Sequence, residues 1–489
     1  MSAEDGRVGD MDPDTFRRWG QEVVEWIATY MEGRESLPVL SQSRPGDLRA
    51  LLPAHPPEEG EDPSAWLEDF RRLVVPGVTH WNHPGFLAYF AISGSGPGVL
   101  GEMLTAALNV NGMLWRTSPA ATELEEHVVG WLAELLGLPE STFGVIQDTA
   151  SSSSFAALAA ARHLAFPKVR EEGLAGAGPG RIYASQEAHS SIEKAVIALG
   201  FGQAGLTRIP VDSEFRMRPD ALAQAMAEDA SQGVRPVAVV ATLGTTSTTS
   251  LDPLTDLLPI ARRHDAWVHV DAAYGGAAAA LPELRPYFAG WDEADSIVVN
   301  PHKWLFTPVD CSVLFTRRRK VLRESLSLVP EYLRSREEDV TTSLMDYGLP
   351  LGRRFRALKL WFVLRYFGVQ GIRARIAHHI ELGQRFGRLV DDASDWVRVA
   401  PVPFSTVVFR WAPEAGEWSG QELDQANLRI MEAVNARGQL FLSHTRLAGR
   451  TCIRVSVGNL ETRWSHLETC WTQLREEAGR LEAELTAAS

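Results

Sequence analysis

The sequence predicts an α/β protein in which a mostly parallel β-sheet is covered by helices. Short apolar runs typical of buried strands alternate with helix-like runs through the middle of the chain. The chain has 489 residues, 45% of them hydrophobic and 22% charged, which suits one large globular unit with accessory lobes. After about residue 370 the pattern changes to a hairpin-like pair flanked by helices, which indicates a smaller α+β lobe.

The chain is expected to divide into three parts. Residues 14–31 carry aromatic and apolar side chains at spacings of three and four, which predicts an amphipathic helix. A proline-rich segment at 52–63 follows it, so this helix either packs against another subunit or folds back on its own domain. We expect an N-terminal helical arm over 1–90, a large ligand-binding domain over 91–370 and a small C-terminal α+β domain over 371–489.

Charge and cysteine content exclude several classes of function. The net charge of −14 argues against a nucleic-acid partner. The three cysteines include no CxxC pair, so we expect a reducing compartment, no disulfide framework and no bound metal. The sequence shows neither a signal-peptide pattern nor an apolar run long enough to cross a membrane. A cytoplasmic protein with no membrane partner is therefore expected.

Polar residues follow the predicted strands at 144–147, 181–185, 236–244, 266–271 and 296–300. Ligands of parallel sheets bind beyond the carboxyl ends of the strands, so these residues are candidates for one site. Asp148, Thr149 and a run of serines follow the first strand and begin a helix, whose N-terminus suits an anion. His189 follows the second strand and Thr246 the third. Each of them also has an ordinary structural explanation as a cap or turn residue.

The last two strands deliver the most reactive candidates. Asp271 ends one strand, and Asn300, His302 and Lys303 follow the next in the run "SIVVNPHKWLF". A lysine between apolar flanks is either a surface residue at a strand end or an amine whose lowered pKa serves chemistry. Pyridoxal phosphate (PLP) needs an anion site, an acid, a flat face for stacking and an imine-forming amine, and it would use the whole set.

A dinucleotide site is the competing interpretation. The run "GPGVLG" at 96–101 matches G-x-G-x-x-G. It precedes the alternating strands, however, and Pro97 removes an amide that a pyrophosphate would need. It also leaves Asp271, His189 and Lys303 without a role. The serines near residue 151 do not form a hydrolase elbow, because the chain contains no G-x-S-x-G.

The segments "TSPAATELE", "ASQEAHSSIEKA", "TLGTTSTTSLDPL", "WVHVDAAYGG", "NPHKWLFTPVDCS" and "LPLGRRFRALKLWFVLR" resemble the group II PLP-dependent decarboxylases. The likeness is greatest to the aromatic-L-amino-acid decarboxylases of bacterial type and covers nearly the whole chain. It implies a fold type I PLP enzyme with a seven-stranded type of sheet. It also implies a homodimer with active sites at the subunit interface.

The resemblance assigns roles to the residues already singled out. Lys303 would hold PLP as an internal aldimine, and Asp271 would pair with the pyridine nitrogen. His189 would stack on one face of the ring and Ala273 would touch the other. The remaining cofactor contacts would come from Ala150, Ser151, Asn300 and His302 at the phosphate and from Thr246 near Asp271.

The implied reaction is decarboxylation of an aromatic L-amino acid, namely tryptophan, phenylalanine, tyrosine or dopa, through an external aldimine and a quinonoid. The products are an arylalkylamine and CO2. Tyr332, in a loop at about 325–347, matches the tyrosine that returns a proton to Cα. In the related aldehyde synthases, which consume oxygen, this position resembles a phenylalanine. Oxidative aldehyde formation, a histidine or acidic substrate, and a PLP-binding protein without turnover remain as alternatives.

The expected substrate pocket is where the sequence departs most from the family. Ala91 and Ile92 stand where animal dopa decarboxylases carry Pro-Thr, Val309 replaces a larger aromatic residue, and residues 108–114 match a segment that reaches across the dimer. The pocket is predicted to include Trp81, Tyr89, Phe90, Ile92, Asn111, Met113 and Val309. Arg353 and Arg354 could bind an anion, but a helix start or an interface salt bridge explains them better.

Overall fold

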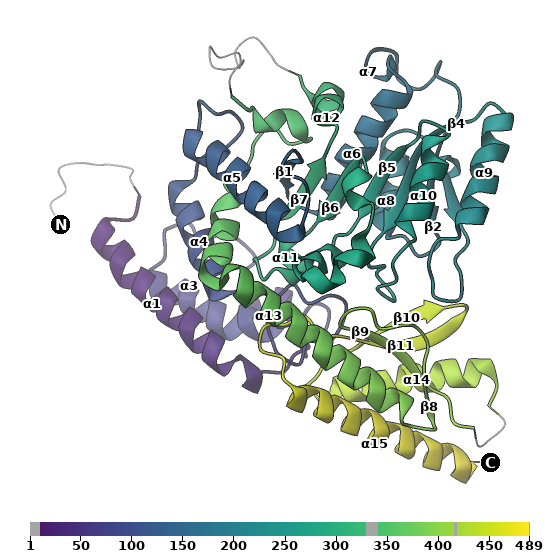
Figure 1. Cartoon of the computed structure of the whole chain (residues 1–489). Helices are drawn as coiled ribbons and strands as arrows, with labels where there is room; N and C mark the ends of the chain where they lie inside the picture. The colour runs from purple at the N-terminus through teal and green to yellow at the C-terminus, as the bar shows by residue number, and fades with distance from the viewer. Residues whose placement is uncertain (1–9, 329–340, 415–417, 489) are drawn as a thin grey trace, which may run out of the picture.

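The computed structural model describes residues 10–328, 341–414 and 418–488 (Figure 1). Its central element is a sheet whose strand order is β1-β7-β6-β5-β4-β2-β3. The strands are β1 (Phe143–Gln147), β2 (Gly180–Ser185), β3 (Leu206–Ile209), β4 (Arg235–Thr242), β5 (Trp267–Asp271), β6 (Ser296–Val299) and β7 (Ser312–Thr316). Only β7 runs antiparallel to its neighbours in this sheet, so the predicted mostly parallel seven-stranded sheet is confirmed.

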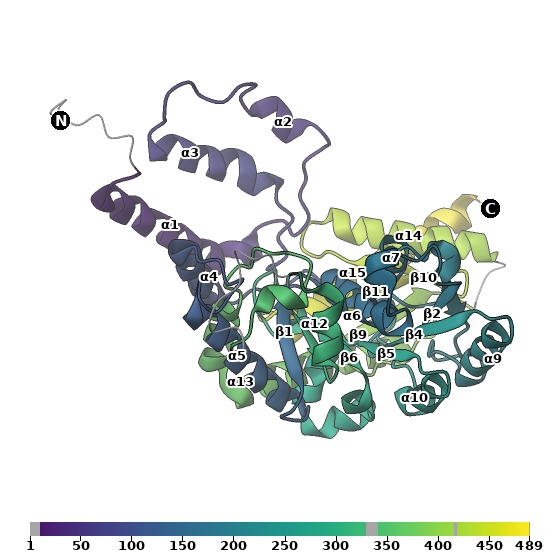
Figure 2. The same ribbon diagram turned by 90° about the horizontal axis from the view of Figure 1, so that it is seen from above.

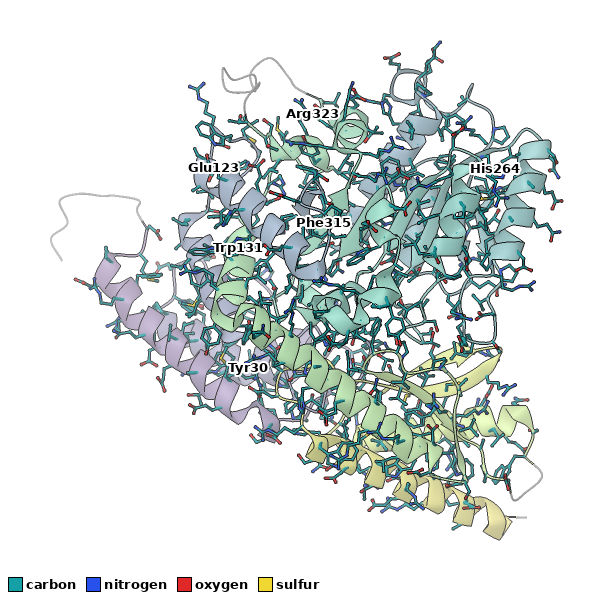
Figure 3. All side chains as sticks on the ribbon, viewed as in Figure 1. Tyr30, Glu123, Trp131, His264, Phe315 and Arg323 are labelled. Carbon is teal, nitrogen blue, oxygen red and sulfur yellow. The ribbon has the colours of Figure 1, made fainter. Side chains whose placement is uncertain are left out.

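Helices cover both faces of this sheet. Successive residues of a strand point to opposite faces, and both faces carry apolar side chains that the helices bury. In β1, Val145 packs in a cluster with α6 (Ala150–Ala165) and α8 (Ser190–Ala198). Its neighbour Ile146 packs in the opposite cluster with α5 (Pro119–Leu136) and α13 (Ala357–Asp391). Side chains fill the space between the layers, and Phe315 of β7 is among the fully buried ones (Figure 3).

The five strands expected from the sequence are present, while β3 and β7 were not expected. Strand β3 has four residues, pairs only with β2 and contains the exposed Arg208, so it lacks a continuous apolar run. Strand β7 lies close behind the "HKWLF" segment and is followed directly by α12 (Arg319–Leu326). The remaining helices around the sheet include α7 (Val169–Glu172), α9 (Pro219–Ser231) and α10 (Leu254–Arg262).

The N-terminal arm consists of α1 (Pro13–Gly33), α2 (Asp47–Leu51) and α3 (Pro63–Asp69). Figure 2 shows that α2 and α3 project away from the body of the molecule. Helix α1 contains no buried residue, and the side chain of Phe16 is 66% exposed. It still touches the body at one end, where the hydroxyl of Tyr30, labelled in Figure 3, lies 3.0 Å from Nδ1 of His80.

The glycine-rich run at 96–101 opens α4 (Gly96–Leu108) and is not preceded by a strand. This context excludes the dinucleotide-binding turn, which requires a strand leading into the helix. Gly101 instead permits close packing, because a Cβ there would lie 2.7 Å from Cα of Lys359 in α13.

The C-terminal domain is built on an antiparallel sheet in the order β10-β11-β9-β8. Its strands are β8 (Trp396–Arg398), β9 (Thr406–Trp411), β10 (Ser443–Leu447) and β11 (Arg450–Ser456), and its helices are α14 (Gly420–Ala436) and α15 (Trp464–Ala488). The predicted hairpin is β10–β11. Helix α13 leads into this domain. It begins at Ala357, before the expected boundary at about residue 370, and breaks close to that boundary at Gly368 (φ 61°).

No helix within the described residues is long and apolar enough to cross a membrane.

Candidate active site

A cavity of ≈ 210 Å³ lies at the carboxyl ends of β1, β2, β4, β5 and β6. Because β1 and β6 both run opposite to β7, these five strands all end at the same edge of the sheet. The structure therefore brings together side chains that follow separate strands. All nine residues predicted to bind a cofactor line this cavity: Ala150, Ser151, His189, Thr246, Asp271, Ala273, Asn300, His302 and Lys303.

Lys303 lies in the short helix α11 (Pro301–Trp304), directly after β6. Its neighbours Trp304, Leu305 and Phe306 are fully buried, while the lysine itself is only partly buried because it faces the cavity. Burial lowers the pKa of the Lys303 amine; Asp271 opposes this shift and Arg454 adds to it. A lowered pKa increases the share of neutral amine, which is the nucleophilic form needed to bind an aldehyde.

Asp271 is the last residue of β5 and is buried. One of its carboxylate oxygens accepts a hydrogen bond from the backbone N–H of Ala273 at 3.1 Å. The structure thus supplies a fixed acceptor at the end of the strand, opposite the lysine in the same cavity. A carboxylate held in this way can stabilise a positive charge on a ligand.

His189 is the N-cap of α8 and lies beyond the end of β2. Its Nδ1 accepts the backbone N–H of Ser191 at 3.2 Å and lies 2.8 Å from the Ser191 hydroxyl. Burial lowers the pKa of His189, although Asp271 opposes this shift. The neutral ring therefore carries its proton on Nε2 and presents an uncharged flat face to the cavity.

The opposite wall of the cavity is suited to an anion. The first backbone N–H groups of α6, at Ala150 and Ser151, have no partner within the helix and lie at the positive end of its dipole. His302 lies across from them; burial and nearby Lys303 lower its pKa to about 4, so the imidazole is neutral. Its Nδ1 accepts the N–H of Cys311 at 2.9 Å, which leaves the ring proton on Nε2.

Two buried polar atoms on the cavity wall have no hydrogen-bond partner among the described residues: Oγ1 of Thr242 and Oδ1 of Asn300. The amide nitrogen of Asn300 lies 3.3 Å from Nε2 of His302. Since Nε2 carries the proton, the amide satisfies it when its oxygen faces that atom, and the NH2 group is then free for a ligand. Buried polar groups require partners, so the Thr242 hydroxyl and the free NH2 group of Asn300 fit a polar cofactor.

Three lining residues were not singled out from the sequence, namely Ser191, Thr242 and Tyr274. Thr149 and Gly244, which follow strand ends in the sequence, also line the cavity. The motif "VDAAYGG" contained the signal for Tyr274, whose ring stacks on Phe90 at a centroid distance of 3.8 Å. Gly244 is required by its backbone, since φ is 107° and a Cβ would lie 3.0 Å from Cα of Gly275.

The structure does not bring the predicted substrate pocket together in one chain. Of its seven residues only Phe90 lines the cavity. The rings of Trp81 and Tyr89 stack on each other at 5.9 Å, and both side chains are more than a third exposed. Ile92 and Met113 are partly buried elsewhere, while Asn111 and Val309 are exposed. Tyr332 lies outside the described residues.

Arg353 and Arg354 have partners other than a ligand. Arg353 forms a buried ion pair with Glu125 at 2.7 Å, and its backbone N–H donates to Oδ1 of Asn111. Arg354 pairs with Glu102 of α4. Both residues lie just before α13, which begins at Ala357, and both ion pairs are within one chain, so an interface salt bridge stays a prediction.

A lysine with a lowered pKa, a facing carboxylate, a neutral histidine and an anion-binding helix end, set at one edge of a mostly parallel sheet, define a fold type I PLP-dependent enzyme. Residues 45–412 match the pyridoxal-dependent decarboxylase conserved domain. The chain belongs to the pyridoxal-dependent decarboxylase family, and it is a PLP-dependent amino-acid decarboxylase. The family, fold class and cofactor predicted from the sequence are thereby confirmed.

Individual relatives are similar over almost the full length. Tryptophan decarboxylase 2 of Oryza sativa subsp. japonica is 39% identical over 96% of this chain and 96% of its own. A phenylacetaldehyde synthase of Arabidopsis thaliana is also 39% identical, over 96% of this chain and 97% of its own. The crystal structure of Oryza sativa TDC with PLP and tryptamine matches with a TM-score of 0.94 and 35% identity, covering 97% of this chain and all of the other.

Proposed function

We propose that the enzyme removes the α-carboxylate of an aromatic L-amino acid and releases the arylalkylamine and CO2. The main support for this proposal is the cavity that Lys303 shares with Asp271 and His189. Phe90 and Tyr274 give this cavity an aromatic wall. Relatives of the same length are named for tryptophan and tyrosine decarboxylation, which supports this substrate class.

When bound, PLP supplies an aldehyde that links to an amine and a ring that accepts electrons. Lys303 would hold the cofactor through its side-chain nitrogen and exchange it for the substrate amine. Asp271 would stabilise positive charge on the ring. His189, with its proton on Nε2, would cover the ring face, exclude water and orient the substrate carboxylate. The α6 N-terminus, Asn300 and His302 would hold the phosphate.

An acidic substrate would need a free cation in the cavity. The charge of Arg454 acts on the pKa of Lys303, but Arg454 does not line the cavity. Its guanidinium donates to backbone carbonyls of Ser247 and Tyr89. These observations favour an uncharged aromatic side chain over a glutamate-like one.

A homodimer would complete the substrate end of the site. Helix α4 exposes Leu100, Leu104 and Leu108 at a spacing of four residues, each about half exposed. A hollow of ≈ 460 Å³ lies beside them, lined in part by Trp361 and Tyr366 of α13. Exposed apolar stripes of this kind mark subunit interfaces. The family resemblance implies that a second copy would bring its own residues 108–114 toward the cavity. We also propose that the enzyme is located in the cytoplasm.

The decisive experiment is a product assay. Purified, PLP-loaded protein is incubated with L-tryptophan, L-tyrosine, L-phenylalanine, L-dopa, L-histidine and L-glutamate, and the products are identified by mass spectrometry. One amine for each CO2, from aromatic substrates only and without peroxide, is the expected result. Amine from histidine or glutamate alone would refute the proposed substrate class.

Oxidative aldehyde formation is the second candidate, because phenylacetaldehyde synthases are among the relatives. That reaction consumes O2 and water and yields aldehyde, CO2, ammonia and H2O2, so peroxide separates the two. The tyrosine at position 332 favours the simple decarboxylase. We therefore expect Tyr332→Phe to shift the product from amine to aldehyde with peroxide; an unchanged amine yield would remove this role from Tyr332.

A further inference from the structure

Two residues of the small C-terminal sheet hold the backbone of Tyr89. Ser443 of β10 and Arg454 of β11 are paired across the antiparallel strands. The hydroxyl oxygen of Ser443 accepts the Tyr89 N–H at 3.1 Å, and a guanidinium nitrogen of Arg454 donates to the Tyr89 carbonyl oxygen. Tyr89 has a φ of 48°, which is unfavourable for a residue other than glycine. Such a conformation persists only where neighbouring groups hold it.

The held segment places Phe90 against the reactive lysine. The ring centroid of Phe90 lies 5.3 Å from Nζ of Lys303 and 4.5 Å from Cζ of Arg454. Phe90 also stacks on Tyr274, with 15° between the planes. Arg454 of the small domain and Lys303 of the large domain therefore both lie against the Phe90 ring.

The stack continues to the residue after the lysine. Tyr274 lies parallel to Trp304, with a centroid distance of 4.7 Å and an interplanar angle of 6°. Trp304 is fully buried, and its indole N–H donates to Nδ1 of His379 in α13 at 3.0 Å. Lys303 is thus positioned from two sides, by the Phe90 ring near its amine and by Trp304 next to it in the chain.

We propose that Arg454 is a positioning residue for Lys303, which it holds through Tyr89, Phe90 and the aromatic stack. The small domain would thereby set the position of the reactive amine in the large domain. This inference rests on the role of Lys303 proposed above. It gives a function to Arg454, which does not itself line the cavity.

The surroundings of Arg454 favour positioning over substrate binding. Its side chain is almost fully buried, and Nε donates to the carbonyl oxygen of Ser247 at 3.1 Å. Nη2 has no hydrogen-bond partner among the described residues, but the guanidinium packs on the ring of Phe90, which lines the cavity while Arg454 does not. A substrate carboxylate would have to displace that ring to reach the arginine.

The charges that act on Lys303 come from different elements. Asp271 of β5 favours the protonated amine, while Arg454 of β11 opposes it. His189 before α8 and His302 in α11 also lie near, and burial keeps both neutral. Burial and the Arg454 charge both oppose Asp271, so loss of that charge removes one of the two effects, and the protonated form of the nitrogen becomes more favourable.

The test compares Arg454→Lys, Arg454→Met and Ser443→Ala, with Arg410→Lys as the matched control. Arg410 is another buried arginine of this sheet, but it pairs with Asp424. Three quantities are measured on the PLP-loaded proteins: the pH midpoint of the visible absorbance band, and kcat and KM with an aromatic substrate. The midpoint is read without substrate, so it reports the state of the Lys303 nitrogen apart from turnover.

We expect Arg454→Met to raise the midpoint and to lower kcat about tenfold with little change in KM. Arg454→Lys keeps the charge, so the midpoint should stay while kcat falls, because lysine lacks the flat group that covers Phe90. Ser443→Ala should lower kcat about threefold without moving the midpoint. Arg410→Lys should leave all three quantities unchanged.

An unchanged midpoint in Arg454→Met overturns the proposal. So does a rise in KM alone, which would make Arg454 a substrate ligand. If Arg454→Met does not fold, Arg454→Lys and Ser443→Ala decide through kcat, and an unchanged kcat in both overturns the proposal. A wild-type protein with no visible band would instead refute the proposed role of Lys303 itself.

Discussion

The two ends of the cavity are built in different ways. The end near β5 and β6 collects nine predicted residues from five strand ends of one chain. The other end has only Phe90 of the seven residues predicted to contact substrate. The residues of the proposed cofactor end therefore come from a single copy, whereas the proposed substrate end would depend on loops, on the arm and on a second copy. The predictions below separate these two ends by experiment.

The largest effect is expected at the cofactor end. Lys303→Ala should abolish the visible absorbance of the PLP-loaded protein and lower turnover by at least about a thousandfold, because the amine that would hold the cofactor is gone. Absorbance and amine release measure the two effects. Lys320→Ala, at an exposed position of α12, is the control and should behave as wild type. Full turnover by Lys303→Ala would exclude this lysine from the chemistry.

The second effect should fall on the substrate end alone. Leu104→Arg places a charge in the exposed stripe of α4 and should convert a dimer into monomers, as measured by analytical ultracentrifugation. We expect turnover to fall about a hundredfold while the visible absorbance remains, because one chain supplies the cofactor end. Leu164→Arg, at a similarly exposed leucine of α6, is the matched control. A dimer that survives Leu104→Arg would move the interface elsewhere.

The last prediction concerns acid stability and touches neither end of the cavity selectively. Burial lowers the pKa of His269 and of His302 to about 4, and that of His379 to about 3, so all three are neutral when folded. The unfolded chain binds these protons below about pH 6.5 and the folded chain does not. The free energy of unfolding should therefore fall as the pH drops from 6.5 to 4, by about 1.4 kcal/mol per pH unit for each histidine.

Denaturant titrations across this pH range measure that slope. His379→Asn keeps an acceptor for the Trp304 indole N–H but cannot be protonated, so it should reduce the slope by about one proton. A slope identical to wild type would mean that His379 is not neutral in the folded protein. Because these histidines lie in the large domain and in α13, dimer dissociation should not follow the same pH dependence.

The cofactor end could be predicted from sequence because each of its residues lies within a few positions of a strand end. A short apolar strand followed by a polar residue is a local pattern, and parallel strands deliver such residues to one edge. Asp271 after "WVHV" and Lys303 after "SIVVNPH" both follow this rule. The pattern holds regardless of how the rest of the chain packs.

Arg454 and the position of Tyr89 could not be predicted in this way. Arg454 alternates with apolar residues in an ordinary strand, and its partner Tyr89 lies at the other end of the chain. Their contact depends on the register of β10 with β11 and on the path of residues 85–89 along the small domain. Strand β3 was missed for a related reason, since its pairing with β2 and not an apolar run defines it.

Helix α13 belongs to two hydrophobic cores at once. Leu360, Leu364 and Ile372 pack in the core of the large sheet, while Leu382, Phe386 and Val390 pack in the core of the small one. Neither domain can lose this helix without exposing apolar surface. The boundary between the domains is therefore not a boundary between independent folding units, and the C-terminal region expressed alone would lack part of its own core. The two domains should melt together, in one cooperative transition.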